Sequence, residues 1–225
     1  MISSLNKCLE PNDYRELGLW VYAFDFAVES KSIPYMPNPH LHRRWEYGMA
    51  MAFLEQLGGP EKIKTVLDIG GAGSLFAPIA MSLGYHVTVV DPDPCVFMLA
   101  GQARNTGGAG GDAICQDFMD WNDPGVFDAV VSLSTIEHIE DDVAFIKKLQ
   151  KHAKHGIFLT TDFSMDGGQY SPAHLRTYTP KTLKNKIVAE LDPEWNFLGT
   201  PDWKDNGPWV DGYNFACVGC VNEEV

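Results

Sequence analysis

Apolar residues occur along this chain in short uninterrupted runs that alternate with segments of helical periodicity. The runs predict five strands, at 65–70, 86–91, 113–117, 127–134 and 155–163. Between them, apolar residues spaced three and four positions apart predict helices over about 74–83, 94–103 and 138–152. Strands that alternate with helices form a parallel sheet covered on both faces, so we expect a doubly wound α/β fold.

The last third of the chain departs from this alternation. A helix is predicted over 180–190, and two apolar runs follow it, at 195–199 and 213–221. The loop between these two runs is rich in Trp, Pro, Asp and Gly, which favours an antiparallel pair of strands. Together with the five earlier strands, this pair predicts a seven-stranded, mostly parallel sheet with a C-terminal antiparallel hairpin.

Before the first strand the pattern is helical but interrupted by prolines. Residues 1–30 predict a helical lead-in, and the proline-dense segment 33–40 predicts a loop. Helical periodicity resumes over 42–57. A chain of 225 residues has the length of one domain, which we divide into a helical and proline-rich cap segment, 1–60, and an α/β core, 61–225.

The small-residue turn after the first predicted strand carries the strongest chemical signal. The segment 65–91 reads as a strand, the turn 70–74 (GGAGS), a helix, a second strand and then Asp91. Small residues let the backbone approach a ligand, and the following helix offers free N–H groups and the positive end of its dipole. An acid at the tip of the second strand accepts hydrogen bonds from ribose hydroxyls. The unit therefore predicts a cofactor that carries a nucleoside.

Asp68 narrows the choice of cofactor. A carboxylate inside the first strand repels a pyrophosphate but suits the ammonium and sulfonium groups of S-adenosylmethionine (SAM). The stretch 65–91 resembles the first two motifs of the class I SAM-dependent methyltransferases, whose usual pattern is acid-x-Gly-x-Gly-x-Gly. Asp68 and Gly70 match this pattern, whereas Ala72 and Ser74 replace the two later glycines. The departure leaves the turn geometry open but still predicts a close-packed turn.

The resemblance covers roughly residues 42–221 and implies a set of cofactor contacts. It places Asp68 near the methionine end of SAM, or as a cap of the turn, and Asp91 at the ribose. Asp117 and Phe118, after the third strand, are expected at the adenine. Leu133 and Ser134, at the tip of the fourth strand, are expected on the opposite side of the cofactor. The implied cofactor residues are Asp68, Gly70, Gly71, Ala72, Gly73, Asp91, Pro92, Asp117, Phe118, Leu133 and Ser134.

Two further segments that resemble methyltransferase motifs imply residues that would contact the methyl acceptor. The segment 134–138 resembles the fourth motif of relatives that read S-x-I-E-H, which would place His138 at the sulfonium as a base for a hydroxyl or amine. The alternative for His138 is a packing or hydrogen-bonding role at a helix N-terminus. Segments like 174–178 bound the substrate cavity in many relatives, where Arg176 would pair an anionic substrate or one of the chain's own acids. The implied substrate residues are Tyr35, Tyr47, His138, His174, Arg176 and Tyr178.

These features together predict a methyltransferase that acts on an oxygen or nitrogen atom of a small molecule. The segments 33–40 and 44–47 are similar to the lead-in of some bacterial methyltransferases of small molecules and cell-surface sugars, so a sugar or a natural-product intermediate fits as acceptor. A non-catalytic SAM-binding or partner-assembly protein with the same fold is the alternative, and a protein-modifying methyltransferase stays open. A short-chain nicotinamide oxidoreductase lacks support, because no Tyr-x-x-x-Lys pair follows the fourth strand.

Cysteine and histidine positions argue against a disulfide framework and against a metal. The five cysteines are an odd number, and Cys217 and Cys220 form a C-x-x-C inside a predicted strand, where they would face opposite sides of the sheet. These two residues therefore predict ordinary buried cysteines. No metal-ligand spacing is recognisable among His40, His42, His138 and His174, so the sequence predicts no metal.

Net charge and hydropathy limit the partners that we expect. A net charge of −13 disfavours a sequence-independent hold on nucleic acid, whose affinity comes largely from phosphate neutralisation. No stretch reaches the roughly 20 apolar residues of a membrane span. The segment 1–16 lacks the basic start and apolar run of a secretory signal. We expect a cytoplasmic protein that binds neither membrane nor nucleic acid, and the oligomeric state stays open.

Overall fold

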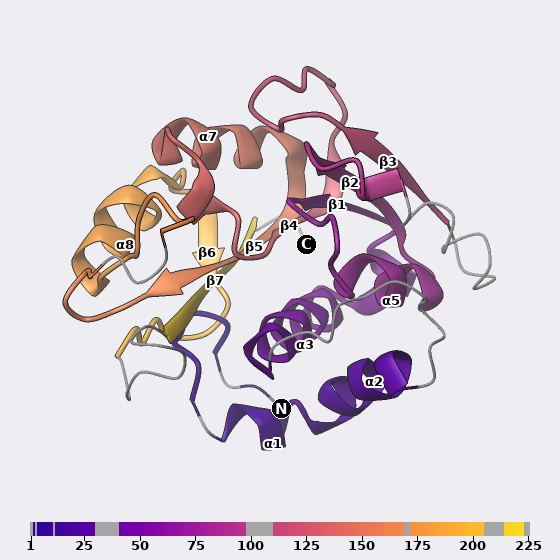
Figure 1. The fold of residues 1–225 in the computed structure, drawn as a ribbon, viewed down its shortest axis with the longest axis horizontal. Helices are drawn as coiled ribbons and strands as arrows, with labels where there is room; N and C mark the ends of the chain where they lie inside the picture. Colours follow the sequence, from indigo (N-terminus) through magenta and orange to yellow (C-terminus); the bar gives the residue numbers. More distant parts are fainter. Residues whose placement is uncertain are drawn as a thin grey trace.

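The protein is described by a computed structural model that covers residues 2, 4–10, 12–29, 41–97, 110–168, 172–204 and 214–222. Its centre is a seven-stranded sheet with the strand order β3-β2-β1-β4-β5-β7-β6 (Figure 1). The strands are β1 (Thr65–Ile69), β2 (His86–Asp91), β3 (Gly111–Cys115), β4 (Phe127–Ser132), β5 (Ala153–Phe163), β6 (Trp195–Phe197) and β7 (Asn214–Asn222). The predicted doubly wound, seven-stranded α/β fold is confirmed.

Strand directions also follow the prediction. The pairs β1–β2, β1–β4, β2–β3 and β4–β5 are parallel. Strand β7 runs antiparallel to both β5 and β6, so the last two strands form the expected C-terminal antiparallel pair. The order reverses at β1, from which the chain proceeds first to β2 and β3 and later to β4 and β5. In open sheets of this kind, ligands bind at this switch point, beyond the carboxyl ends of the strands.

Helices cover both faces of the sheet (Figure 1). On one face lie α3 (Leu41–Gln56) and α5 (Phe76–Ser82), with α1 (Asp13–Glu16) and α2 (Gly18–Glu29) further out. The other face carries α7 (Asp142–His152). The shorter elements are α4 (Gly59–Lys62), α8 (Pro180–Lys186) and the 3-10 turns η1 (Ile136–His138) and η2 (Val188–Glu190).

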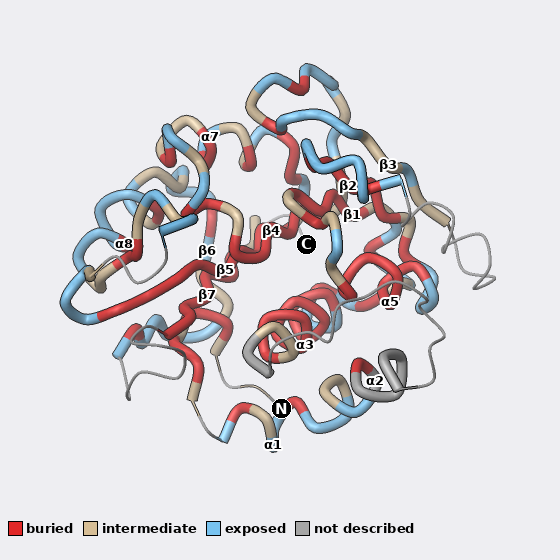
Figure 2. The backbone as a smooth tube through the Cα atoms, in the orientation of Figure 1, coloured by how far each residue is buried: buried red, intermediate tan, exposed pale blue. Residues whose placement is uncertain are grey.

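Two hydrophobic clusters fill the spaces between the sheet and its helices. Figure 2 shows that the central strands and α3 consist largely of buried residues. Alternate residues of one strand contribute to different clusters, because successive side chains point to opposite faces. Cys217 belongs to the cluster under α3 and Cys220 to the cluster under α7, so the predicted opposite orientation of these buried cysteines is confirmed. Central strands buried on both faces explain the uninterrupted apolar runs in the sequence.

The N-terminal lead-in is helical only in part. Helix starts at Asp13, whereas Lys7 and Cys8 form isolated β-bridges to Asp202 and Ala216. The physical reason is the Asn6 side chain, whose amide donates to the carbonyls of Leu198 and Gly219 at 3.0 and 2.9 Å. These bonds hold the segment beside β7 in an extended form.

One predicted helix starts later than expected, and two predicted segments lie wholly or mostly outside the described residues. The helix predicted from residue 138 begins at Asp142, because the Asp141 side chain caps it by accepting from Ala144 N at 2.9 Å. The proline-rich loop 33–40 and most of the helix predicted over 94–103 lie outside the described residues. Among the described helices, none is long and apolar enough to cross a membrane.

Candidate active site

The turn after β1 is packed so closely that two of its residues have to be glycine. Gly70 has φ 76°, a left-handed conformation, and a Cβ atom there would lie 2.1 Å from Thr135 Oγ1. A Cβ atom on Gly71 would lie 2.2 Å from Asp68 Oδ2. The turn is therefore close-packed, as the sequence predicts, although its glycines do not follow the usual spacing.

Asp68 lies beneath this turn with an unsatisfied carboxylate. Its side chain is 1% exposed, and among the described residues Oδ2 has no hydrogen-bond partner. Burial raises the pKa of Asp68 to about 8, and the negative charge of Asp91 adds to the shift. A buried carboxyl that lacks a partner is suited to a cationic ligand group, which would favour its ionised form.

Asp91 fixes the turn to the tip of β2. Its Oδ2 accepts from Ala72 N at 3.0 Å, and its Oδ1 accepts from Asp93 N at 2.7 Å. A carboxylate has about four lone-pair sites, so two such bonds leave room for ligand hydroxyls. Asp91 is thus oriented by the backbone and still able to accept hydrogen bonds from a ribose.

The predicted cofactor residues line two connected hollows at the carboxyl ends of β1, β2 and β4. A larger hollow of about 350 Å³ lies on the β2 side, and a smaller one of about 170 Å³ lies on the α3 side. Gly70 and Ser134 line both hollows and so form the boundary between them. We call the two together the cofactor cleft, with a large and a small lobe.

The cleft brings together most residues that the sequence singles out. In the large lobe are Gly70, Asp91, Pro92, Asp117, Phe118, Ser134 and His138. In the small lobe are Tyr47, Asp68, Gly70, Gly71, Ala72, Gly73, Leu133 and Ser134. The small lobe therefore contains Asp68, and the large lobe contains Asp91. This arrangement suits a ligand with an amino-acid group at one end and a nucleoside at the other.

Phe118 and Asp117 differ in how they face the large lobe. Phe118 is buried and packs edge-on against Phe145, with ring centroids 5.5 Å apart, so only part of its ring can border a ligand. Asp117 is exposed, and its Oδ1 accepts from Met119 N at 2.8 Å. This bond orders the loop after β3, and Asp117 still lines the large lobe.

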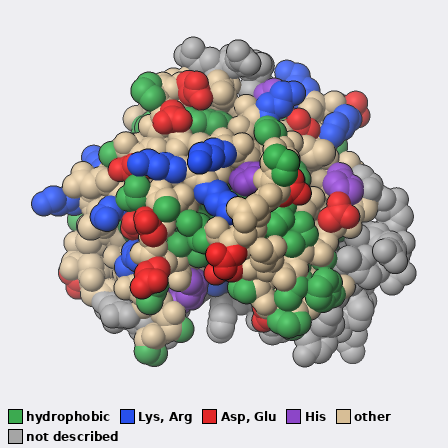
Figure 3. Space-filling model, turned by 90° about the horizontal axis from the view of Figure 1, so that it is seen from above, with side chains coloured by type: hydrophobic (Ala, Val, Ile, Leu, Met, Phe, Trp, Pro, Cys, Tyr) green, Lys and Arg blue, Asp and Glu red, His purple; other side chains and the backbone are tan. Residues whose placement is uncertain are grey.

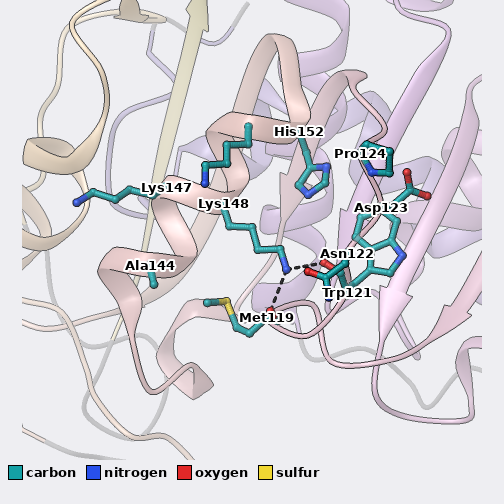
Figure 4. Close-up of a pocket in the computed structure, with 10 residues that line it drawn as sticks. Met119, Trp121, Asn122, Asp123, Pro124, Ala144, Lys147, Lys148 and His152 are labelled. Carbon is teal, nitrogen blue, oxygen red and sulfur yellow. Dashed lines mark hydrogen bonds between the residues drawn. The ribbon is translucent and has the colours of Figure 1, made fainter.

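The same loop is anchored by a lysine from α7 (Figure 4). Lys148 Nζ donates to the carbonyls of Phe118, Met119 and Trp121 at 2.6, 2.9 and 2.6 Å. These bonds occupy the ammonium group, whereas the neighbouring Lys147 points away from the loop.

A wide surface groove of about 680 Å³ opens beside this lysine, between α7 and the loop. On the face seen from above, basic side chains gather among acidic ones (Figure 3). The groove contains none of the residues predicted for the cofactor or the acceptor, and the lysine that points into it is bonded to backbone carbonyls. The cofactor cleft is therefore the better candidate site despite its smaller volume.

Glu46 adjoins the cofactor cleft through Ser134 and is not among the site residues predicted from the sequence. It is fully buried on α3 and accepts hydrogen bonds from the hydroxyls of Ser134 and Thr160. Its other oxygen pairs with Arg43 Nη1 at 3.0 Å, and the negative charge of Glu46 raises the pKa of Arg43. Glu46 thus joins α3 to the tips of β4 and β5. The i,i+3 spacing of the charged pair was the available signal, but it does not reveal burial.

Ser134 is held in a strained conformation by these bonds. Its φ is 46°, a left-handed value that is uncommon outside glycine. Its amide donates to Thr160 Oγ1 at 3.0 Å, and its hydroxyl donates to Glu46. The neighbours therefore determine the conformation, which is the usual circumstance in which such strain persists at a functional site.

Two histidines meet at the outer side of the large lobe. The rings of His138 and His174 are edge-on, with centroids 4.6 Å apart, and His138 Nδ1 is 3.2 Å from Ala173 O. Partial burial lowers the pKa of His138, and the neighbouring His174 lowers it further. His174 Nδ1 is hydrogen-bonded to the buried carboxylate of Asp162. His138 is therefore largely neutral near pH 7 and able to accept a proton.

Arg176 and Tyr178 line neither lobe of the cofactor cleft. Arg176 donates to the carbonyls of Ile139 and Glu140, while the Tyr178 hydroxyl donates to Asp142 Oδ2 at 3.1 Å. Both side chains hold the turn that precedes α7. Their substrate roles stay predictions, as do those of His174 and Tyr47, and Tyr35 lies outside the described residues.

Comparison with known proteins assigns this arrangement to a family. Residues 67–160 match the family model described as "Methyltransferase domain". A ubiquinone biosynthesis O-methyltransferase of Pseudomonas paraeruginosa is 30% identical over 102 residues, which cover 44% of this chain and 44% of that protein. The protein of the same description from Caulobacter vibrioides is 30% identical over 142 residues, which cover 62% and 52% of the two chains. The chain thus matches only about half of the length of these curated relatives, or less.

A solved structure supports the same fold over almost the whole chain. The 1,6-didemethyltoxoflavin-N1-methyltransferase of Burkholderia thailandensis, with 1,6-didemethyltoxoflavin and S-adenosylhomocysteine bound, superposes with a TM-score of 0.63 at 14% identity. The superposition covers 95% of this chain and 91% of that one. The fold over most of the chain is that of a methyltransferase. Residues 67–160 match the methyltransferase domain of the SAM-dependent class I enzymes, whose cofactor is S-adenosyl-L-methionine.

Proposed function

We propose that this protein transfers the methyl group of SAM to an oxygen or nitrogen atom of a small-molecule acceptor. The observation that carries the proposal is the buried Asp68 side chain in the small lobe, whose Oδ2 has no hydrogen-bond partner among the described residues, beside a turn that admits no side chain at Gly71. An amino-acid cation would favour the ionised form of this carboxyl, whereas a pyrophosphate anion would oppose its ionisation. The proposal applies to the matched core and extends the family's activity to this chain.

The residues of the cleft fit the cofactor without further groups. Bound SAM supplies an electrophilic methyl group on a positively charged sulfur atom. In our proposal Asp68 balances the positive charge of the methionine portion, and Asp91 accepts hydrogen bonds from the ribose hydroxyls. Asp117 accepts from the adenine amino group at the entrance of the large lobe. Gly70 and Gly71 let the turn pack directly against the side chains of Thr135 and Asp68, which positions the turn beside the ligand.

An acceptor bound at the outer side of the large lobe would meet His138. A hydroxyl or amine nucleophile loses a proton on methylation, and a neutral imidazole beside it can take that proton. The lowered pKa of His138 supports this role, because it keeps the ring neutral. Both acceptor atoms have precedent in the similar proteins, which include ubiquinone O-methyltransferases and a toxoflavin-pathway N-methyltransferase.

The decisive experiment measures turnover as well as binding. The protein is incubated with SAM and a panel of hydroxylated aromatics, sugars and small amines, and the formation of S-adenosylhomocysteine is followed by mass spectrometry. We expect acceptor-dependent product from at least one class. SAM binding without product from any acceptor would favour the non-catalytic alternative, and binding of NAD(H) in place of SAM would overturn the proposal.

We predict that SAM binding at pH 7 releases a proton from Asp68. With its pKa raised to about 8, this carboxyl is mostly protonated in the free protein, and the cationic ligand favours the ionised form. The release should be about 0.9 proton, and the affinity should rise about tenfold between pH 6 and pH 7. Calorimetry in buffers of different ionisation enthalpy measures the release directly. Asp68→Asn should abolish it, and equal proton release by this variant would contradict the assignment.

A further inference from the structure

Two buried carboxyl groups beside the cofactor cleft each have an oxygen without a partner. Glu137 lies in η1, directly after β4, and Asp162 lies near the end of β5; they are 0% and 1% exposed. Among the described residues, neither Glu137 Oε1 nor Asp162 Oδ1 has a hydrogen-bond partner. Burial of a carboxylate oxygen without a partner costs free energy, so these atoms are suited to a ligand.

A histidine completes a compact group of donors. The His174 side chain is 14% exposed, and its Nδ1 contacts the Asp162 carboxylate. One donor atom from each of Glu137, Asp162 and His174 lies within 4.8 Å of the other two. Donors on opposite sides of a single metal ion are about 4–5 Å apart, so the three are close to the arrangement that one ion requires.

The local charge also favours a cation. Burial raises the pKa of Glu137, and the charge of Asp162 raises it further. Burial likewise raises the pKa of Asp162 to about 7, with the charge of Glu46 adding to the effect. Arg43 opposes both shifts, but its guanidinium is paired with Glu46 at 3.0 Å. A bound divalent ion would displace the protons that burial favours on these carboxyls and would balance their negative charge.

We propose that Glu137, Asp162 and His174 form a binding site for one divalent metal ion. Two carboxylates and one imidazole are a mixed oxygen and nitrogen donor set, which suits Mn²⁺ or Zn²⁺ better than a soft thiophilic ion. Three protein donors leave coordination positions for water or for an oxygen atom of an acceptor.

The position of this metal site relates it to the acceptor. The ring of His174 meets that of His138 edge-on, and His138 lines the large lobe of the cofactor cleft. His138 thus contacts both the proposed metal site, through His174, and the large lobe. The three donors come from η1, from β5 and from the loop after β5, so no local spacing in the sequence could reveal them. The prediction that the protein binds no metal was based only on the spacing of histidines.

The first experiment titrates metal-free, full-length protein with Mn²⁺ alone. Calorimetry and the EPR signal of free Mn²⁺ report the binding, and parallel titrations with Zn²⁺, Mg²⁺ and Ca²⁺ establish the preference. We expect one Mn²⁺ or Zn²⁺ ion per chain. Failure of all four ions to bind stoichiometrically overturns the proposal.

Variants then locate the ion. Glu137→Gln and Asp162→Asn preserve side-chain size and remove the charge, and each should weaken Mn²⁺ binding at least about tenfold, since even outer-shell partners contribute that much. The matched control is Asp112→Asn, which removes the acid of an exposed pair with His86 at 3.0 Å and should leave the affinity unchanged. Equal affinity in all three variants overturns the proposal.

An NMR measurement on the unaltered protein locates the ion even if one of the variants does not fold. Bound Mn²⁺ broadens the NMR signals of nearby nuclei, so the imidazole signals of His174 and His138 should disappear first. The His86 signals should persist, and broadening that begins at His86 overturns the assignment. None of these measurements uses SAM or an acceptor, so their outcome is independent of the proposed methyl transfer.

Discussion

Replacement of Asp91 by alanine is expected to weaken the binding of SAM and S-adenosylhomocysteine by about 100-fold. Hydrogen bonds from ligand hydroxyls to a charged carboxylate contribute about 1.5–3 kcal/mol each, and 2.7 kcal/mol corresponds to a hundredfold. The change also removes the acceptors of Ala72 N and Asp93 N, so the turn after β1 loses its side-chain bond to β2 and keeps the backbone bond from Gly70 N to Val90 O. Calorimetric titration with S-adenosylhomocysteine measures the effect.

Asp112→Ala provides the matched control for this result. Asp112 lies on the adjacent strand β3, its side chain is 68% exposed, and it lines neither lobe of the cofactor cleft. Affinity should change less than about twofold in this variant, because surface charges contribute little. If Asp91→Ala bound the ligand as tightly as the control, the ribose assignment would be wrong.

Glu46→Ala is expected to lower the free energy of unfolding by about 3 kcal/mol. Removal of one member of a buried ion pair typically costs about 3–5 kcal/mol, because the other member and its hydrogen-bonding neighbours lose their partner. Here Arg43 and the hydroxyls of Ser134 and Thr160 are left behind. Relief of the repulsion between Glu46 and Asp162 offsets part of the loss, which places the value at the low end.

Urea unfolding and calorimetric melting measure this loss of stability. For a chain of this length we expect the melting temperature to fall by about 6–12 °C. Glu55→Ala is the control on the same helix: its carboxylate is exposed and accepts one bond from Trp20 Nε1 at 3.3 Å, so its loss should cost less than about 1 kcal/mol. Equal destabilisation by both changes would show that Glu46 does not connect α3 to the sheet.

Strong local patterns explain why the fold could be predicted. Uninterrupted apolar runs mark strands that are buried on both faces, and the runs at β1, β2 and β4 agree with the structure within two residues at each end. The cofactor residues were predictable for a related reason. The turn, Asp68 and Asp91 follow one another along a single strand–helix–strand unit, so their proximity is local.

Contacts between distant segments explain what the sequence did not indicate. Glu46 reaches Ser134 and Thr160 from a helix that packs on the sheet, and nothing around position 46 distinguishes a buried carboxylate from one on the surface of a helix. The extended form of the segment around Lys7 and Cys8 has a similar origin. It depends on the amide of Asn6 bonding to backbone carbonyls that follow it by about two hundred positions.

The hydrogen bonds of Asn6 have a consequence for the way in which the chain reaches its native state. Asn6 and Gly219 are 213 positions apart, so the segment around Asn6 is completed only when β7, far along the chain, has formed. Strand β7 also inserts between β5 and β6, which leaves the edge of β5 unpaired until then. Contacts of such long sequence separation form slowly. The edge of β5 is thus expected to stay exposed during folding until β7 pairs with it, and unpaired strand edges of this kind favour aggregation.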